Sequence, residues 1–493
     1  RYSLLLLFFI LFSATNQAQI LQNNLHKEVR GVWVATVNNI DWPSKNNLSV
    51  EEQKKEFINL VQFHKKNGIN TLIVQIRPCG DAFYPNNFEP WSEYLTGKQG
   101  VPPNPFYDPM AFMVEETHKQ GMEFHAWLNP YRVLFNVEKS TLAPSHICFL
   151  HPEWFLVYGD KKYFNPGIPA VWDYTCMIVK NIIEKYDVDA IHMDDYFYPY
   201  RIDGKEFEDN DIYLQNSRGL NKDDWRRSNC DTIIKKIYTT IKSINPQIKF
   251  GISPFGVWRN QSVDSINGSK TFAGQTNYDD LYADILLWLK NGWIDYVVPQ
   301  LYWEKGHNKA DFDVLLPWWN NHNYGKHVYI GHGLYRALPV EDKLPMWKNK
   351  NELFNQLNDI KKYPTTKGSV LFSSKSVENM KIEWLDTLRN TFYNEPALIP
   401  TMDYLPNIII SKAIVTKQAD DFKITYIGKE KIKGFILAST NLTDTNKITI
   451  EQMFDNVKEI KIPGTILNQA QKKYYIFVLG RWNHISDGVV LIK

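Results

Sequence analysis

The sequence is poor in cysteine and has almost no net charge, and both shortages exclude classes of protein. Its 493 residues include 56 basic and 54 acidic residues, which gives a formal net charge of +2. Without a basic run, the chain lacks the electrostatic footprint of a nucleic-acid or anionic-membrane binder. The four cysteines, Cys79, Cys148, Cys176 and Cys230, lie far apart, so they form neither a disulfide scaffold nor the close pairs of a zinc site, and no pairing is favoured.

Several catalytic motifs are also missing. No phosphate-cradling G-x-G-x-x-G or P-loop follows a strand, and no G-x-S-x-G elbow occurs. His125 and His192 lack the partner that an HExxH zinc motif supplies. The acidic loop Asp203–Asp211 lacks the regular ligand spacing of a calcium site, which favours a solvated loop. We therefore expect neither a metal nor another cofactor, and a metal-dependent polysaccharide deacetylase is disfavoured.

Only one long apolar run is present, and it lies at the start of the sequence. The run Leu4–Phe12 follows Arg1 and precedes small and polar residues. It is shorter than the roughly 20 residues of a spanning helix, so it predicts a signal peptide over residues 1–18, with a signal anchor as the alternative. We expect an exported protein, periplasmic or extracellular, with no stable membrane span after cleavage.

Aromatic residues, in contrast, are abundant. Trp, Tyr and Phe number 16, 27 and 27, which is 14% of the chain. Exposed rings can act as platforms for the apolar faces of sugars. We expect Trp288, Trp318 and Trp319 to pack in helices, and a second group to face a glycan: Phe83, Tyr84, Trp91, Tyr131, Trp154, Tyr196, Tyr198 and Trp303.

Short apolar runs that end in polar residues recur eight times, and a segment with helical periodicity follows each. Such alternation predicts an α/β fold, a (β/α)₈ TIM barrel over residues 28–395, and the count disfavours an open doubly wound sheet. The expected strands are Arg30–Val37, Asn70–Pro78, Glu123–Pro130, Ala190–Tyr196, Lys249–Gly256, Asp295–Glu304, His327–Arg336 and Gly368–Ser376.

Helix signals separate these runs. Ser49 with Glu52 forms a capping box, and Asp108 with Pro109 begins another helix. After Pro396 helical periodicity stops, and about seven β-rich stretches predict a small sandwich of fibronectin type III-like or immunoglobulin-like character over residues 397–493, with packing favoured over glycan contact. The expected helices are 51–66, 109–120, 171–186, 225–243, 279–291, 312–322, 351–362 and 382–392.

Strand parity selects the candidate site. One parity of a barrel strand points to the lumen and the other to the helices. The apolar residues take the helix side, which leaves polar residues inward at the carboxyl ends of four strands, where barrel active sites lie. Asp195 lies just past the fourth strand, and Asp81 follows the second. The inward set is Gln75, Arg77, His125, Trp127, Asn129, His192, Asp194, Gln300, Tyr302 and Glu304.

Two of these residues have the chemistry for cleaving a glycosidic bond. That reaction needs one ionised carboxylate and one protonated carboxyl. We expect Arg77, His192 or Asn129 to hold Asp194 ionised, and burial beside Tyr302 and Trp303 to keep Glu304 protonated. A structural salt bridge is the alternative for Asp194, and sugar binding for Glu304. Asp195 ranks second as catalytic carboxylate, and Asp81 is a further candidate acid.

The same stretches resemble the glycosyl hydrolase-like family 10, formerly domain of unknown function 187. The matching segments run in order from Glu28 to Glu304, and the resemblance extends to about Pro396. One departure is Ala190, where the family pattern DGIH has Gly. The segments are EVRGVWVATVNNIDWPS, LIVQIRPCGDAFYP, FHAWLNPYR, HPEW, DAIHMDDYFYP, FGISPFGVWR and VVPQLYWE.

The resemblance implies a barrel like those of α-amylase and α-galactosidase, with an Asp nucleophile at the end of strand four. That position is Asp194, with His192 where amylase-like enzymes carry Arg, and an acid after strand six fits Glu304. Family members include exported bacterial enzymes that act on peptidoglycan glycan strands. We therefore expect a glycoside hydrolase; the alternative is a noncatalytic glycan-binding protein. Expected substrate contacts are Gln75, Arg77, Asp81, Trp127, Asn129, Tyr131, Arg132, His192, Asp195, Tyr196, Gln300, Tyr302 and Trp303.

Overall fold

The computed structural model describes residues 21–338, 351–467 and 471–491. The expected signal peptide, residues 1–18, lies outside the described residues. Within them, no helix is both long and apolar enough to cross a membrane.

Eight parallel strands close into a barrel, each hydrogen-bonded to its neighbours in chain order, with the last strand paired to the first. All eight expected strands are confirmed, although most end a few residues earlier than the apolar runs suggest. A closed parallel barrel leaves no free sheet edge. The strands are β1 (Val29–Val34), β2 (Thr71–Arg77), β3 (Glu123–Leu128), β7 (Ala190–Met193), β8 (Lys249–Ile252), β9 (Tyr296–Val297), β10 (His327–Gly333) and β11 (Thr366–Phe372).

A helix follows each barrel strand. Ser49 and Glu52 form the expected capping box, and Asp108 caps the next helix. The single helix expected over 279–291 is wrong, because Tyr282 has a φ of 54° and Asp284 caps a new helix. The outer helices are α2 (Val50–Lys66), α4 (Pro109–Lys119), α5 (Pro169–Lys185), α7 (Lys222–Ile244), α9 (Ile285–Lys290), α10 (Phe312–Asn321), α11 (Glu352–Ile360) and α13 (Ile382–Thr387); shorter ones are α3 (Glu93–Thr96), α6 (Asn210–Asn216), α8 (Asn277–Asp280) and α12 (Ser374–Glu378).

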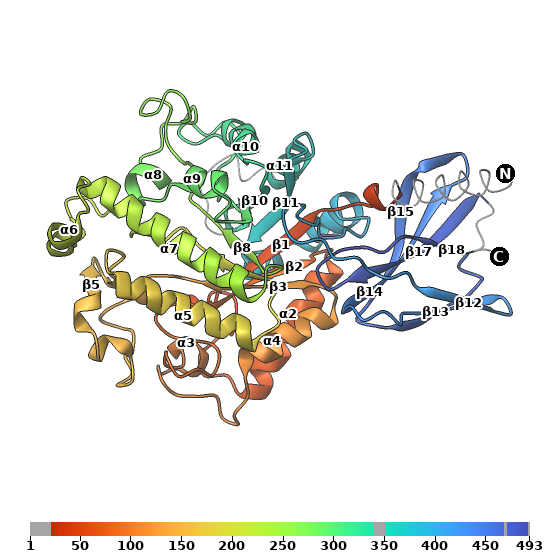
Figure 1. The fold of residues 1–493 in the computed structure, drawn as a ribbon, viewed down its shortest axis with the longest axis horizontal. Coiled ribbons are helices and arrows are strands. Elements are labelled where there is room, and N and C mark those ends of the chain that lie inside the picture. Colours follow the sequence, from red (N-terminus) through yellow and green to blue (C-terminus); the bar gives the residue numbers. More distant parts are fainter. Residues whose placement is uncertain (1–20, 339–350, 468–470, 492–493) are drawn as a thin grey trace, which may run out of the picture.

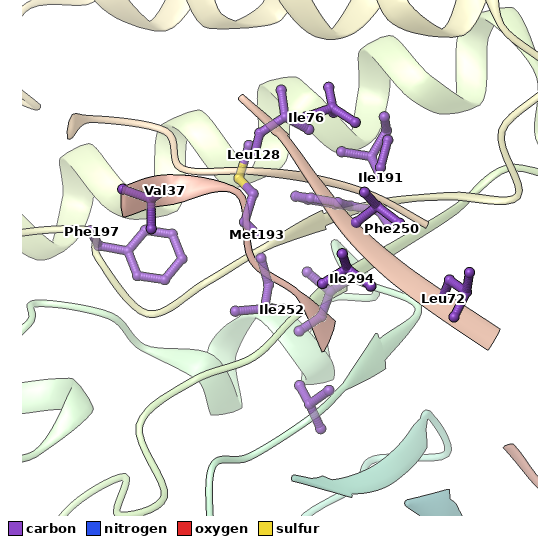
Figure 2. Packing of buried hydrophobic residues seen from close by; sticks show 14 of the residues in the cluster. Val37, Leu72, Ile76, Leu128, Ile191, Met193, Phe197, Phe250, Ile252 and Ile294 are labelled. Atoms are coloured by element: carbon purple, nitrogen blue, oxygen red, sulfur yellow. The ribbon is translucent and has the colours of Figure 1, made fainter. Parts of the chain in front are cut away.

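Strand parity separates two apolar clusters, as expected. Leu72, Ile76 and Leu128 point outward from the barrel and pack with helix residues (Figure 2). Trp127 and Tyr296 belong to a second cluster of inward-facing residues that fills the lumen. Trp288, Trp318 and Trp319 are buried in the outer cluster, which confirms their packing role.

The segment after β3 is more structured than its sequence suggests. It contains a three-stranded antiparallel sheet of β4 (Arg132–Leu134), β6 (Lys161–Phe164) and β5 (Phe155–Tyr158). With α6, this sheet lies at the end of the barrel opposite the C-terminal domain (Figure 1). The carboxyl ends of the barrel strands face the same way, so these loops surround the expected site.

The C-terminal part forms two antiparallel sheets. The smaller has the order β12-β13-β16 and the larger β15-β14-β17-β18. They lie at the end of the barrel where the strands begin (Figure 1). The strands are β12 (Ile414–Gln418), β13 (Asp421–Thr425), β14 (Ile432–Asn441), β15 (Asp444–Asp455), β16 (Glu459–Ile462), β17 (Lys472–Gly480) and β18 (Val489–Leu491).

A buried ion pair joins these sheets to the barrel. Arg481, just after β17, donates to the carboxylate of Asp189, which has no exposed side-chain surface. Asp189 also accepts from His118 Nε2 and from the Phe124 amide, each at 2.8 Å. Burial alone would raise the pKa of Asp189, but Arg481 and His118 hold it well below its usual range. The carboxylate thus stays ionised and depends on Arg481.

Removing Arg481 should destabilise the whole chain. Breaking a buried pair from one side leaves an uncompensated charge, which costs about 3–5 kcal/mol. We expect Arg481→Met to lower the free energy of unfolding by that order, measured by urea denaturation. The control is Lys431→Met, because Lys431 is 80% exposed and its contact with Asp187 is long, at 3.7 Å, so little energy depends on it. Equal midpoints for the two variants would contradict the importance of this contact.

Candidate active site

Two adjacent carboxyl groups lie at the end of the fourth barrel strand. β7 ends at Met193, and Asp194 and Asp195 follow with 4% and 2% of their surface exposed. Three neighbouring groups hold Asp194 in place. Asn129 Nδ2 donates to both carboxylate oxygens, at 3.0 and 3.2 Å, and Trp127 Nε1 donates at 3.2 Å. The Tyr196 amide adds a longer contact of 3.4 Å.

The register of the barrel creates this cluster. Trp127 lies opposite His192 in the pairing of β3 with β7, so the next inward positions, Asn129 and Asp194, meet at the mouth. Asn129 is itself fixed, because its Oδ1 accepts from the amides of Tyr131 and Arg132 at 3.3 and 2.7 Å. The strand parity read from sequence therefore brings together the residues that it predicts.

Arg132, and not Arg77, is the cation that acts on Asp194. Burial raises the pKa of Asp194, and the Arg132 charge and the hydrogen bonds of Asn129 and Trp127 oppose that rise. Arg77 instead forms a buried ion pair with Glu89, at 2.5 Å, so both its expected contact and the alternative salt bridge with Asp194 are wrong. It contacts the segment that carries Asn129 through hydrogen bonds to the carbonyls of Asn129 and Pro130, at 2.5 and 3.4 Å.

Asp195 has the more strongly perturbed carboxyl group. Burial first, and the charge of Asp194 second, raise the pKa of Asp195 to about 7, while hydrogen bonds from Tyr200 and Gln300 oppose the rise. The Tyr200 hydroxyl donates directly to the carboxylate. The parity rule gives Asp195 the second rank, yet the structure buries it beside Asp194, in contact with Tyr200.

The segment after β9 covers the site with rings. Gln300 Nε2 donates to the Ser253 carbonyl at 2.9 Å. The Trp303 ring contacts Phe255 edge-on, with 5.3 Å between centroids, and Phe255 contacts Tyr200. These ring contacts connect Tyr200, which donates to Asp195, with the segment that carries Trp303 and Glu304.

Glu304 lies in the turn that leads to α10. The residue is 7% exposed, and its backbone carbonyl accepts from the amides of His307 and Phe312, at 3.3 and 3.4 Å. Tyr302, two residues earlier, packs against Phe372, with 5.9 Å between ring centroids. The catalytic role of Glu304 stays a prediction.

Other expected substrate contacts have structural partners. The Gln75 amide oxygen accepts from the amides of Thr36 and Val37, at 3.1 and 3.0 Å, and so ties the loop after β1 to β2. Asp81 accepts from Gln99 at 3.3 Å within its own loop, and burial raises its pKa to about 7. His192 has no exposed surface, so it supports the site from below rather than lining it.

The expected division of the aromatic residues is partly wrong. Phe83, Tyr84, Tyr131 and Tyr198 are at most 1% exposed and belong to the outer hydrophobic cluster. Tyr131 therefore cannot contact a substrate in this conformation. The remaining members of the group, Trp91, Trp154, Tyr196 and Trp303, are half-buried, so rings of these four stay available to a ligand.

Sequence reasoning missed several rings around the carboxyl groups. Trp33, Phe372 and Tyr335 continue the ring contacts of Tyr302 around the barrel mouth. The parity rule could have identified Trp33, because it occupies an inward position of β1. Tyr200 lies in an irregular loop, where no periodicity indicates direction.

The sequence is similar to a known family and to several named proteins. A sequence model of the family described as Glycosyl hydrolase-like 10 matches residues 28–349. The chain is 47% identical over 400 residues to Glycosyl hydrolase YngK of Bacillus subtilis (strain 168), covering 80% of this chain and 78% of that protein. It is 37% identical over 366 residues to Glycosyl hydrolase DigH of Escherichia coli (strain K12), covering 70% and 82%.

Similarity to solved structures is weaker. An alpha-L-fucosidase isoenzyme 2 from Paenibacillus thiaminolyticus has a TM-score of 0.46 and 14% identity, with 74% of this chain and 49% of that chain covered. At this level the similarity adds nothing to the barrel that the strand order already establishes.

The pKa of Asp195 should depend on Asp194. In Asp194→Asn the neighbouring negative charge is lost, so the proton of Asp195 is held less tightly and its titration midpoint should fall from about 7. Carbon-13 NMR of labelled aspartate carboxyl groups measures the midpoint. Asp231 is the control in the same spectrum, because burial raises its pKa to about 7 but it bonds to Trp288, away from the site. An unchanged Asp195 midpoint would contradict the coupling.

Proposed function

Because this chain belongs to the glycosyl hydrolase-like 10 family, we propose that it hydrolyses glycosidic bonds of a polysaccharide, with Asp194 as a catalytic carboxylate. One observation carries the proposal: Asp194 is buried at the carboxyl end of a barrel strand, held by Asn129 and Trp127, beside a second carboxyl group with a pKa of about 7. Active sites of such barrels lie at this end.

The chemistry requires two carboxyl groups in different protonation states. Cleavage passes through an oxocarbenium-like transition state, which an ionised carboxylate stabilises or attacks while a carboxylic acid protonates the leaving oxygen. Burial raises the pKa of Asp194, but Arg132, Asn129 and Trp127 limit that rise, so we assign the ionised role to Asp194.

The acid is Glu304 or Asp195. Glu304 comes from the segment after a different strand, β9, which suits groups that flank a glycosidic bond from two sides. Asp195 is protonated over a large fraction of molecules near neutral pH, because its pKa is about 7. The two assignments make different predictions for substrates whose leaving group needs no proton.

Features of the surroundings fit a polymeric substrate, and peptidoglycan glycan strands are the proposed one. A crevice of about 840 Å³ begins in the loop that follows Asp195, where Arg201 lines it, and extends to Asp280. Half-buried rings such as Trp303 offer stacking surfaces. A glycan strand outside the cytoplasm also agrees with the proposed export of the chain.

The C-terminal domain is proposed to be fibronectin type III-like. What supports this is its strand order, because a three-stranded sheet of the first, second and fifth strands faces a four-stranded sheet of the others. Its docking by Arg481 favours a packing role.

Substitution of each carboxyl group tests the mechanism. Asp194→Asn should lower kcat on a polysaccharide by at least about 10²-fold with an unchanged Tm. Of Asp195→Asn and Glu304→Gln, the variant that removes the acid should lose activity on the polysaccharide but keep it on nitrophenyl glycosides, since nitrophenolate leaves without a proton. Released reducing ends and nitrophenolate absorbance give the rates.

Asp231→Asn is the matched control, because it removes a similarly perturbed carboxyl group whose partner, Trp288, lies outside the catalytic cluster. It should keep full activity. An active Asp194→Asn variant would remove Asp194 from the mechanism, and oligosaccharide binding without any product would favour the noncatalytic glycan-binding protein.

A further inference from the structure

A chain of buried polar groups runs through the barrel lumen beneath the site. His192 Nδ1 lies 3.0 Å from the Tyr296 hydroxyl, and His125 Nδ1 lies 2.9 Å from the same oxygen. His125 Nε2 in turn lies 2.9 Å from a carboxylate oxygen of Glu123, at the start of β3. All four residues are at most 2% exposed. The chain therefore extends from the catalytic end of the barrel to the end where the C-terminal sheets dock.

Glu123 determines which group donates and which accepts in each hydrogen bond of this series. Burial alone would raise the pKa of Glu123, but Lys249 and Lys433 hold it well below its usual range, so the group only accepts hydrogen bonds. Lys249 Nζ lies 2.6 Å from both oxygens, and Asn483 Nδ2 donates at 2.7 Å. Lys433 and Asn483 belong to the C-terminal domain.

The protons of the next groups follow from this end. His125 Nε2 must carry a hydrogen to donate to Glu123, and burial lowers the pKa of His125, so its Nδ1 is a bare acceptor. The Tyr296 hydroxyl therefore donates to His125. With its one hydrogen used, the Tyr296 oxygen can only accept from His192, which must carry its hydrogen on Nδ1.

The contacts of His192 at the other end of this hydrogen-bonded series independently require its hydrogen to be on Nδ1. Trp33 Nε1, which can only donate, lies 3.4 Å from His192 Nε2. Ser253 Oγ lies 3.1 Å from the same nitrogen. Burial lowers the pKa of His192 well below its usual range, so the neutral ring has a bare Nε2 that accepts from both. Glu123 and Trp33 thus fix one tautomer of His192 from two sides.

The fixed tautomer matters to the site above. Ser253 and Trp33 are the groups that His192 holds, and the Ser253 carbonyl accepts from Gln300, which is also bonded to Asp195. His192 shares its strand parity with Asp194, two residues on. A flipped tautomer would place two hydrogens, those of Trp33 and His192, against each other in the floor of the site.

We propose that Tyr296 is a positioning residue of this active site: its hydroxyl transmits the hydrogen-bond direction set by Glu123 and the C-terminal domain to His192, and so fixes the floor beneath Asp194 and Asp195. The proposal rests on the proposed hydrolase function only for its kinetic consequence.

Tyr296→Phe removes the hydroxyl that links His125 to His192 but keeps the aromatic ring. Nitrogen-15 NMR of labelled histidine should show hydrogen on Nδ1 of His192 in the wild type and a mixture of tautomers in the variant. On the polysaccharide, kcat should fall at least about tenfold with little change in KM, because a shifted floor affects catalytic geometry more than binding.

Tyr329→Phe is the matched control. Tyr329 is a lumen tyrosine on the neighbouring strand, 2% exposed, and its hydroxyl lies 3.1 Å from His327 Nδ1 and outside the chain. It should lose a similar amount of Tm but keep both kcat and the His192 spectrum. Equal kcat for the two variants, or hydrogen on Nε2 of His192 in the wild type, would overturn the proposal. If the wild type cleaves no glycan, the hydrolase proposal fails, and the tautomer spectra alone decide this one.

Discussion

The side-chain alternation of a closed parallel barrel is the constraint on which the structure depends. Apolar residues of one parity meet the helices, and the other parity enters a lumen closed to water, where an unpaired polar group is costly. Each inward polar residue must therefore find a partner from another strand of the barrel, adjacent or across the lumen. The pairing of Asn129 with Asp194, and of His125 and His192 with Tyr296, follows from this requirement.

The same constraint produces the electrostatics of the candidate site. Burial removes water from Asp194 and Asp195, so nearby charges and hydrogen-bond donors of the protein must compensate each negative charge. Arg132 and Asn129 favour the charged form of Asp194, whereas Asp195 has that charge beside it and a pKa of about 7. Two adjacent residues thereby acquire different acidities from a single strand end. The C-terminal domain contacts the lumen residues from the opposite end of the barrel, where Lys433 and Asn483 bind Glu123.

The sequence predicts much of the fold and the centre of the site, because both depend on periodicity. The eight strands, the capping box at Ser49 and the inward positions of Asn129 and Asp194 all follow from local patterns. What depends on loop conformation could not be predicted this way. Arg77 pairs with Glu89, twelve residues on in an irregular loop, and Tyr131 turns into the outer core from the short connection between β3 and β4.

The abundance of aromatic residues also has a clearer explanation. Most of the rings pack, including some beside the site, and a smaller group surrounds the carboxyl groups. Whether that mouth performs hydrolysis is tested most directly by incubating the wild-type protein with a defined glycan in water enriched in oxygen-18, followed by mass spectrometry. The account predicts shortened oligosaccharides with one heavy oxygen at each new reducing end. Intact glycan, or fragments without the heavy oxygen, would contradict it.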